Sequence, residues 1–370
     1  MSDYWGFELG PIRPPSEAYS LLIRITRNCH WNRCTFCPVY KEREYSRRSV
    51  NHIKRDIDSI SRYIDQLNTT DSEEEIMEVG TKLYATDPQA YRSALLWFRN
   101  GMKSVFLQDA DSLIIPPSDI IEILRYLRER FRSIERVTSY ARSSTVAKIK
   151  DEDIRDFAKA GLNRLHIGME SGSDEVLKRV RKGATKKMHI TAGQKVKTAG
   201  IELSEYVMPG LGGLKLSRNH AMETADALSQ INPDFIRLRP LALPQGKSIF
   251  AGFEKCSDLD VMHELRLFIE NLDVNDTRIV SDHILNLLPE VDGQLPEDKT
   301  AILNVIDQFL NLEPVSQTLY QLGRRIGIFQ GLKDLNDAQK MTRVEKIYLS
   351  QGVTPENIDA ITSQLMQRFI

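Results

Sequence analysis

Three of the four cysteines lie within nine residues, in the segment Cys29-His-Trp-Asn-Arg-Cys34-Thr-Phe-Cys37. Thiolates at this spacing suit an iron–sulfur cluster or a zinc ion. A closed structural zinc site, or a cluster that only transfers electrons, needs four protein ligands. Three cysteines on one loop would leave one metal position open for chemistry. Zinc remains an alternative, with Cys256 or a histidine as its fourth ligand.

Apolar runs that alternate with amphipathic segments must position this loop. The runs are Leu21–Ile25, Ser104–Leu107, Arg136–Ala141, Arg164–Met169, Glu202–Met208 and Phe235–Leu241. Such alternation predicts βαβ units and a parallel sheet. Six units in series favour an α/β fold with a partial (β/α)6 TIM-like barrel, whose reactive residues lie at the carboxyl ends of the strands. The cysteines follow the first run directly, which favours an iron–sulfur site at that end over a zinc clip.

The first two runs are separated by roughly eighty residues, although one crossover helix needs only about a dozen. Val50–Gln66 is one predicted helix, and residues 68–100 are interpreted as a helical insertion after the first strand. Beyond residue 250 the sequence is mostly helical in pattern. We therefore expect an N-terminal segment over 1–17, a barrel over 18–250 and a C-terminal helical extension over 251–370 that caps the barrel.

The composition narrows the class of protein. The 50 basic residues nearly balance 51 acidic ones, and 41% of the chain is hydrophobic, which excludes disorder and a globally basic nucleic-acid binder. The sequence has neither a long apolar span nor a start typical of a signal peptide, so no membrane association is expected. Three clustered cysteines favour a reducing compartment, hence a cytoplasmic location.

The cysteine segment resembles that of the radical S-adenosylmethionine (radical SAM) enzymes. In that superfamily three cysteines after the first barrel strand bind a [4Fe–4S] cluster, and the amino and carboxylate groups of S-adenosylmethionine chelate the open iron. The commonest spacing there is CxxxCxxC, and this chain has CxxxxCxxC, one residue longer. The resemblance implies that Cys29, Cys34 and Cys37 are the cluster ligands. It also implies that Phe36 lies near the adenine.

Other segments extend the resemblance. Glu170, within Gly168-Met-Glu-Ser-Gly-Ser173, matches an acidic residue that contacts the methionyl or ribose part of the cofactor. Lys182 matches a basic residue that pairs with the methionyl carboxylate. Glu205 matches a residue that meets the ribose, and Met208 lies in a segment that flanks the adenine.

The segment Gln108-Asp-Ala-Asp111 stands where the family usually has Gly-Gly-Glu. The resemblance implies that Asp111 could take the part of that glutamate.

Strand alternation places further charged residues at the inward face, because neighbouring side chains in a strand point to opposite sides. Along Leu165-His-Ile-Gly-Met-Glu170, at the fourth run, this predicts that Glu170 faces the barrel interior. In the sixth run it predicts that Arg237 and Arg239 do, and inward guanidinium groups need anionic partners. Those partners could be Glu170, Glu205 or Asp111, or a carboxylate or phosphate of the cofactor or substrate.

Two histidines and a basic run complete the candidates. His283, beside Asp282, could reach the substrate as a proton carrier, and His30 could brace the cysteine loop. Residues 178–197 carry eight basic side chains, which indicate a solvated helical face or, as a minority interpretation, an RNA-binding patch.

The resemblance implies a reaction. A low-potential electron donor, similar to flavodoxin or ferredoxin, would reduce the cluster, and reductive cleavage of S-adenosylmethionine would give a 5′-deoxyadenosyl radical. The radical would abstract hydrogen from an anionic substrate of small or medium size. A non-catalytic carrier of a ligand such as haem, a zinc-stabilised scaffold and an RNA-modifying enzyme remain alternatives.

Overall fold

The computed structural model describes residues 4–70, 72–84, 86–243 and 247–366. Contacts divide the chain into two compact units. The first unit comprises Met1–Asn32, Cys37–Ile167 and Ala192–Leu203, and the second comprises Arg33–Phe36, Gly168–Thr191 and Ser204–Ile370. The predicted domain boundaries at residues 17 and 250 stay predictions.

Eight strands form one sheet in the order β1-β4-β5-β6-β7-β8-β9-β10. They are β1 (Leu21–Arg24), β4 (Ser104–Gln108), β5 (Arg136–Ala141), β6 (Arg164–Glu170), β7 (Glu202–Val207), β8 (Phe235–Leu238), β9 (Thr277–Val280) and β10 (Gly293–Leu295). The pairings β1–β4, β4–β5, β5–β6, β7–β8 and β8–β9 are parallel, and β10 runs antiparallel to β9. The predicted α/β class with a parallel sheet surrounded by helices is confirmed, and the first six strands lie where the apolar runs indicate.

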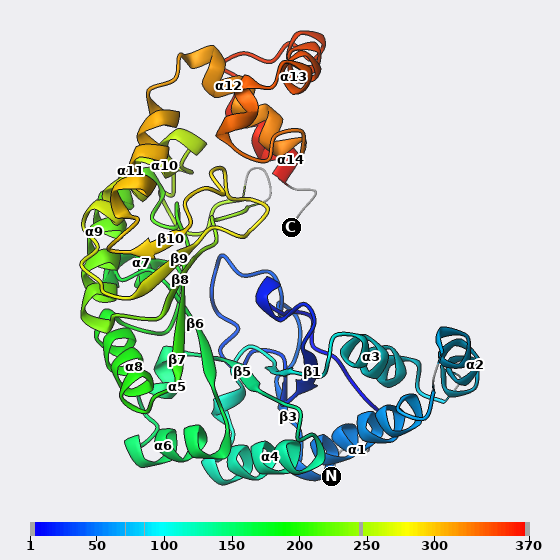
Figure 1. Ribbon diagram of the computed structural model, residues 1–370. Coiled ribbons are helices and arrows are strands. Elements are labelled where there is room, and N and C mark those ends of the chain that lie inside the picture. Colours follow the sequence, from blue (N-terminus) through cyan, green and yellow to red (C-terminus); the bar gives the residue numbers. More distant parts are fainter. Residues whose placement is uncertain (1–3, 71, 85, 244–246, 367–370) are drawn as a thin grey trace. The chain divides into compact units, whose positions relative to one another are not determined.

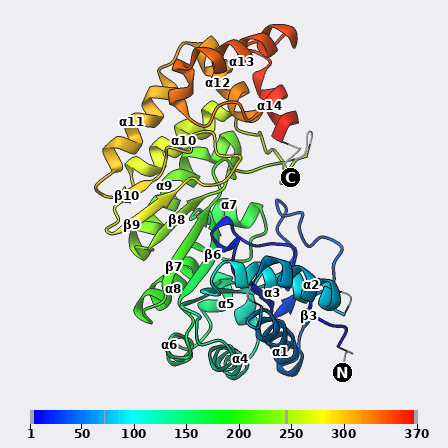
Figure 2. The same cartoon turned by 45° about the vertical axis from the view of Figure 1, so that its right-hand side comes forward.

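Helices of the first unit have apolar stripes at helical spacing. They include α1 (Val50–Leu67), α2 (Glu73–Tyr84), α3 (Pro88–Arg99), α4 (Pro117–Arg130), α5 (Ser143–Val146) and α6 (Asp151–Ala160), with short turns η1 (Pro15–Glu17) and η2 (Ser112–Ile114). In α1 the buried residues Ile53, Ile57, Ile60 and Ile64 recur every three or four positions, as expected of a helix with one buried face. Figures 1 and 2 show α1, α4 and α6 side by side. The helices expected between the first two strands are present as α1 to α3.

Helices of the second unit follow the later strands. They are α7 (Asp174–Arg179), α9 (Gly213–Ile231), α10 (Asp258–Glu270), α11 (Lys299–Leu310), α12 (Pro314–Arg325), α13 (Ala338–Ser350) and α14 (Ile358–Met366), with the turn η3 (Leu332–Asn336); α8 (Lys186–Thr198) crosses the boundary between units. In Figure 1, α9, α10 and α11 lie in sequence, and α12 contacts α13 and α14. The mostly helical character expected beyond residue 250 is therefore present.

The described helices include none with the length and apolar character that a membrane span needs.

Candidate active site at the cysteine loop

The cysteine loop leaves the sheet through a short antiparallel ribbon. Strands β2 (Thr26–Arg27) and β3 (Ser46–Arg47) pair with each other and so close the base of the loop between them. Asn28 has a left-handed backbone (φ 67°) and its side chain donates to the carbonyl of Glu44 at 2.5 Å. The ribbon and this bond hold the two ends of the loop together within the first unit.

A left-handed turn lies between the first two cysteines of the motif, where its spacing is longer. Asn32, which lies between Cys29 and Cys34, has φ 39°, a conformation that asparagine tolerates better than most residues. Its side chain donates to the Tyr40 carbonyl at 2.5 Å, and its backbone N–H points at the Cys29 sulfur at 3.4 Å. The stretch between Cys29 and Cys34 thus contains a turn held by hydrogen bonds of Asn32.

Asp109, at the end of β4, fastens this loop to the sheet. Its buried carboxylate accepts hydrogen bonds from the Tyr40 hydroxyl, from the Asn28 backbone N–H at 3.0 Å and from Arg24 at 2.9 Å. Tyr40 and Asn28 flank the cysteines on either side. Sequence reasoning assigned the role in this segment to Asp111 and missed Asp109. The available signal was the pairing of the first two predicted strands, which brings the end of one beside the loop that follows the other.

The Asp111 side chain contacts other residues of the first unit instead. Its buried carboxylate accepts from the Thr145 hydroxyl at 2.5 Å and from the Arg142 backbone N–H at 3.2 Å, and the His30 ring nitrogen Nδ1 lies 3.6 Å away. Burial raises the pKa of Asp111 to about 6. The contacts with Thr145 and Arg142 position the segment after β5, and a role for Asp111 toward the cofactor stays a prediction.

The cysteines themselves are reduced and form no disulfide. Cys34 is buried, and Cys29 and Cys37 are half-buried. Within the described parts of the chain, no three His, Cys, Asp or Glu side chains gather closely enough to hold one metal ion. Three thiols on one loop remain the donor set that suits an iron–sulfur cluster with one open position.

Residues 33–36 of the loop belong to the second unit and lie against the end of α7. The Thr35 N–H donates to the Val180 carbonyl at 3.0 Å. Phe36 packs, together with Met208, against an apolar cluster that includes Val180 and Leu241. The Lys182 ammonium lies 5.9 Å from the centre of the Phe36 ring, within the range of a cation–π contact.

Three of the residues assigned to S-adenosylmethionine, Phe36, Met208 and Lys182, therefore lie near one another, and Glu170 joins them. The Lys182 ammonium is 3.0 Å from the Glu170 carboxylate. Glu170 itself has a left-handed backbone (φ 65°), which is uncommon for a glutamate and is found more often at functional sites. Its carbonyl accepts from the Met208 N–H at 3.0 Å.

Glu205 supplies the most unusual group of this set. It is fully buried, and neither carboxyl oxygen has a hydrogen-bond partner among the described residues. Burial raises its pKa well above the usual range; the Glu170 charge adds to this, and the Lys182 charge opposes it. A buried polar group without a partner is costly, so this carboxyl is suited to a bound molecule that offers hydroxyl or amino groups.

Gly168 leaves room for this arrangement. A β-carbon at this position would collide with the Glu170 carboxylate and lie 3.2 Å from the Lys182 ammonium. The residues expected to bind the methionyl, ribose and adenine parts of S-adenosylmethionine therefore fit that cofactor in donor types. The roles of the individual residues stay predictions.

Of the two arginines in the sixth apolar run, only Arg237 is buried. It pairs with Asp282 at 2.6 Å, and none of the three acids expected from the sequence is its partner. The register explains the pairing, because Arg237 lies opposite Val280 of β9 and Asp282 follows that strand. Arg239 lies beyond the end of β8 and is exposed, so the expectation that it is a buried cation in need of a partner is wrong.

His283 is half-buried beside this ion pair. Burial, and then the charge of Arg239, lower the pKa of His283 to about 4, so its ring is neutral near pH 7. Nδ1 accepts from the Leu285 N–H at 3.3 Å, which places the ring proton on Nε2. The neutral ring can therefore donate a hydrogen bond, and a role as proton carrier stays a prediction.

Cys256 and the basic run over residues 178–197 have surroundings that favour structural roles. Burial raises the pKa of the Cys256 thiol, and the charges of Glu264 and Asp260 add to this, which disfavours the thiolate that a metal needs. Several members of the basic run are paired with acids, such as Arg179 with Glu175 and Lys186 with Glu223. This pairing favours the interpretation of a solvated helical face.

Comparisons with known proteins test the family resemblance seen in the sequence. A family model described as the radical SAM superfamily matches residues 23–225, more than half of the chain. The 4′-phospho-dehydrooxetanocin synthase of Priestia megaterium is 29% identical over 221 residues, which cover 56% of this chain and 26% of that protein. The tRNA uridine(34) acetyltransferase of Methanocaldococcus infernus is 25% identical over 106 residues, which cover 28% of this chain and 20% of that protein. The matched regions thus span about a quarter or less of these relatives.

Solved structures give lower identities. A methylornithine synthase has a TM-score of 0.43 at 15% identity, with 78% of this chain and 81% of that chain covered. The coproporphyrinogen III oxidase of Escherichia coli has a TM-score of 0.46 at 16% identity, with 68% and 52% covered. The family match includes Cys29, Cys34 and Cys37 as well as Glu170, Lys182 and Glu205. The chain belongs to the radical SAM superfamily of enzymes.

Proposed function

We propose that this chain binds a [4Fe–4S] cluster through Cys29, Cys34 and Cys37 and cleaves S-adenosylmethionine reductively at the open iron. When bound, the reduced cluster would supply one electron to the sulfonium of S-adenosylmethionine, whose carbon–sulfur bond would break to give methionine and a 5′-deoxyadenosyl radical able to abstract hydrogen from a substrate. The protein contributes binding, orientation and the exclusion of water. A low-potential donor similar to flavodoxin or ferredoxin supplies the electron.

The observation that carries this proposal is the group formed by Glu170, Lys182 and Glu205 next to Phe36. The Lys182 ammonium is suited to the methionyl carboxylate, and it can exchange its contact with Glu170 for that ligand. The Glu205 carboxyl, whose pKa burial raises well above the usual range, has both oxygens free, among the residues described, to contact a ribose hydroxyl. Phe36 and Met208 offer apolar surface to the adenine.

The substrate in this proposal is a small or medium-sized molecule with an anionic group. Arg239 supports this part, because it is exposed and forms no ion pair within the described residues. Arg237, two residues before Arg239, is held in place by its ion pair with Asp282. His283, neutral near pH 7, would donate its Nε2 proton to the same group.

The proposal is tested by product analysis after anaerobic reconstitution with iron and sulfide. The full chain should turn brown and, with dithionite and S-adenosylmethionine, release 5′-deoxyadenosine. Cys34→Ala should abolish the release. Cys256→Ala is the matched control, and its iron and sulfide content should equal that of the unmodified chain. Release that persists in Cys34→Ala, or a colourless product that retains zinc, would contradict the proposal.

A further inference from the structure

Two segments that carry residues assigned to S-adenosylmethionine meet at the side chain of His220, in α9. One segment, residues 170–173, lies at the end of β6, and the other, residues 208–210, follows β7. His220 is only 2% exposed, so its ring is enclosed by protein. The two segments and α9 all belong to the second unit.

Both ring nitrogens of His220 have partners. Nε2 lies 3.1 Å from the Met208 carbonyl oxygen, and Nδ1 lies 2.8 Å from the Ser171 hydroxyl. A carbonyl oxygen only accepts, so Nε2 carries the proton, and Nδ1 of the neutral ring accepts from the Ser171 hydroxyl. The same hydroxyl accepts from the Ser173 N–H at 3.0 Å. One imidazole thus links the residue after Glu170 to the backbone of Met208.

This link bears on the conformation of Glu170, whose backbone is left-handed (φ 65°). A glutamate keeps such a conformation only where its surroundings hold it in place. The Glu170 carbonyl accepts from the Met208 N–H at 3.0 Å. Both polar groups of the Met208 backbone are therefore fixed, one by Glu170 and the other by His220. Loss of the ring would release the Met208 carbonyl and the Ser171 hydroxyl together.

The backbone of α9 approaches residues 170–173 closely. A β-carbon on Gly172 would collide with the carbonyl oxygen of Glu223, so the contact requires glycine. The Gly172 N–H donates to the Thr224 hydroxyl at 2.8 Å, and that hydroxyl donates to the His220 carbonyl at 2.5 Å. This segment is therefore packed directly on the helix that carries His220.

Glu264 of α10 also holds the segment after β7. Its buried carboxylate accepts from the Gly210 N–H at 2.7 Å and from the Ser217 hydroxyl at 2.6 Å. The same carboxylate lies 3.6 Å from Nε2 of His220, which favours the tautomer that carries its proton there. Residues 208–210 are thus held by two side chains, one from α9 and one from α10.

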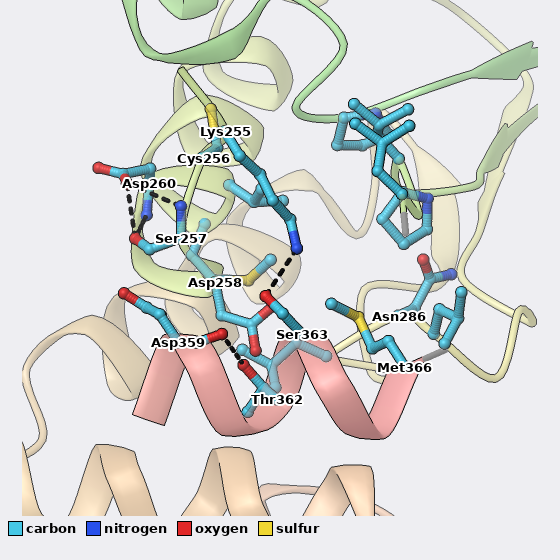
Figure 3. Close-up of a pocket in the computed structure, with 18 of the residues that line it drawn as sticks. Lys255, Cys256, Ser257, Asp258, Asp260, Asn286, Asp359, Thr362, Ser363 and Met366 are labelled. Atoms are coloured by element: carbon cyan, nitrogen blue, oxygen red, sulfur yellow. Dashed lines mark hydrogen bonds between the residues drawn. The ribbon is translucent and has the colours of Figure 1, made fainter. Parts of the chain in front are cut away.

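The segment after β7 borders a cavity as well as these two side chains. Pro209 lines this space, which has a volume of about 630 Å³ and lies beside α14 (Figure 3). The lining includes acids and cations that contact one another, such as Arg325 and Asp258 at 2.6 Å, so its charges select no single class of ligand. Because the segment is not fully packed here, the contacts of His220 and Glu264 matter more to its position.

We propose that His220 is a positioning residue for S-adenosylmethionine, because its ring fixes the segments that carry Glu170 and Met208 relative to each other. The inference rests on the proposed function, in which Glu170 and Met208 contact the cofactor. His220 is buried and acts through these segments. Its removal should therefore loosen both of them and weaken the binding of S-adenosylmethionine, while the cysteine ligands of the cluster keep their places.

The test combines amide hydrogen exchange with equilibrium binding, both on the full chain with its cluster reconstituted. His220→Leu removes both ring nitrogens. In this variant residues 170–173 and 208–210 should exchange about tenfold faster than in the unmodified chain, because local opening of both segments becomes easier. The affinity for S-adenosylmethionine should fall about tenfold. Iron and sulfide content should stay unchanged.

Two further variants separate positioning from a general loss of stability. Leu228→Ala, further along the buried face of α9, should lower the melting temperature but leave the affinity and the exchange of both segments unchanged. His220→Gln keeps an N–H donor near the place of Nε2, so it should restore slow exchange over residues 208–210 while residues 170–173 stay fast. A merely structural role of His220 would instead make exchange and affinity follow the melting temperature in all variants.

Ser171→Ala is the second variant should His220→Leu fail to fold. It removes the hydroxyl that Nδ1 contacts, so exchange should rise over residues 170–173 alone and the affinity should fall about threefold. Unchanged exchange and affinity in these variants, while the unmodified chain binds S-adenosylmethionine, would overturn the inference alone. An unmodified chain that binds no S-adenosylmethionine would overturn the proposed function and the inference with it.

Discussion

At the scale of single residues, the buried carboxylate of Asp109 connects the two sides of the cysteine loop. It accepts from Asn28 before the cysteines and from Tyr40 after them, and it is paired with Arg24. A single side chain with these contacts restricts the loop before any cluster binds. The cysteine spacing indicated the ligands, but it contained no information about this contact, because the residues involved are about eighty positions apart.

Asp109→Asn should destabilise the chain before a cluster is bound. The amide keeps the shape but leaves Arg24 without its buried charge partner, and Glu8 at 3.3 Å compensates only in part. We expect a loss of about 2 kcal/mol in the free energy of unfolding, somewhat below the usual cost of breaking a buried pair. Urea denaturation measures it. Asp111→Asn is the control and should cost less, since burial already favours the neutral form of Asp111; equal losses would show that Asp109 has no special role.

Gly168→Ala should weaken the binding of S-adenosylmethionine without harming the fold. The added methyl group collides with the flexible end of Glu170, which can move aside. We therefore expect a stability change below about 1 kcal/mol, with iron content unchanged and affinity for S-adenosylmethionine reduced about tenfold or more. Equilibrium binding to the reconstituted chain measures the affinity. Unchanged affinity would mean that the Glu170–Lys182 geometry does not matter to the cofactor.

His283 should make the chain sensitive to mild acid. Its pKa is near 4 when folded and near 6.5 when unfolded, so the unfolded chain binds more protons between these values. The free energy of unfolding therefore falls as the pH drops from about 6.5 to 4. His283→Gln should lose less stability than the unmodified chain over this interval, as judged by denaturant titrations at several pH values. His263→Gln, at an exposed position, is the control and should follow the unmodified chain.

At the scale of elements, the residue at which a strand ends determines which predicted site residues stay in the sheet. The sixth apolar run was predicted to extend to Leu241, but β8 ends at Leu238. Pro240 explains the difference, because proline has no N–H for the ladder and restricts the residue before it. Arg239 consequently leaves the sheet while Arg237 stays in it. The short strand β10 escaped prediction, since three residues carry no clear periodicity.

The ion pair between Arg237 of β8 and Asp282, which follows β9, should be energetically coupled. Asp282→Asn alone leaves the buried Arg237 guanidinium short of its anion, with an expected loss of about 1–2 kcal/mol because Asp282 is partly exposed to solvent. Combining it with Arg237→Met removes that uncompensated charge, so the double variant should lose less than the sum of the single variants. Strictly additive losses in thermal or urea unfolding would indicate that the two side chains are not coupled.

At the scale of the whole molecule, the local sequence pattern predicted the helices and strands, whereas contacts between distant segments could not be predicted from it. The alternation of apolar runs with helices sufficed for the α/β class, the order of six strands and the helices between the first two strands. The resemblance to the radical SAM enzymes, and not the alternation, selected Glu170, Lys182, Glu205, Phe36 and Met208, which the structure brings together in the second unit. The partners of Arg237 and the function of Asp109 depended on contacts between distant segments. The cavity beside α14 likewise arises from segments spread over residues 209–366.

The central claim is that three cysteines hold a cluster with one iron open to S-adenosylmethionine. Electron paramagnetic resonance of the reconstituted, dithionite-reduced chain, recorded before and after addition of S-adenosylmethionine, tests it most directly. The account predicts the signal of a reduced [4Fe–4S] cluster whose g values shift on addition, because the open iron gains a ligand. A cluster signal that stays unchanged in the presence of saturating S-adenosylmethionine would contradict the account, as would a reconstituted chain with no cluster signal.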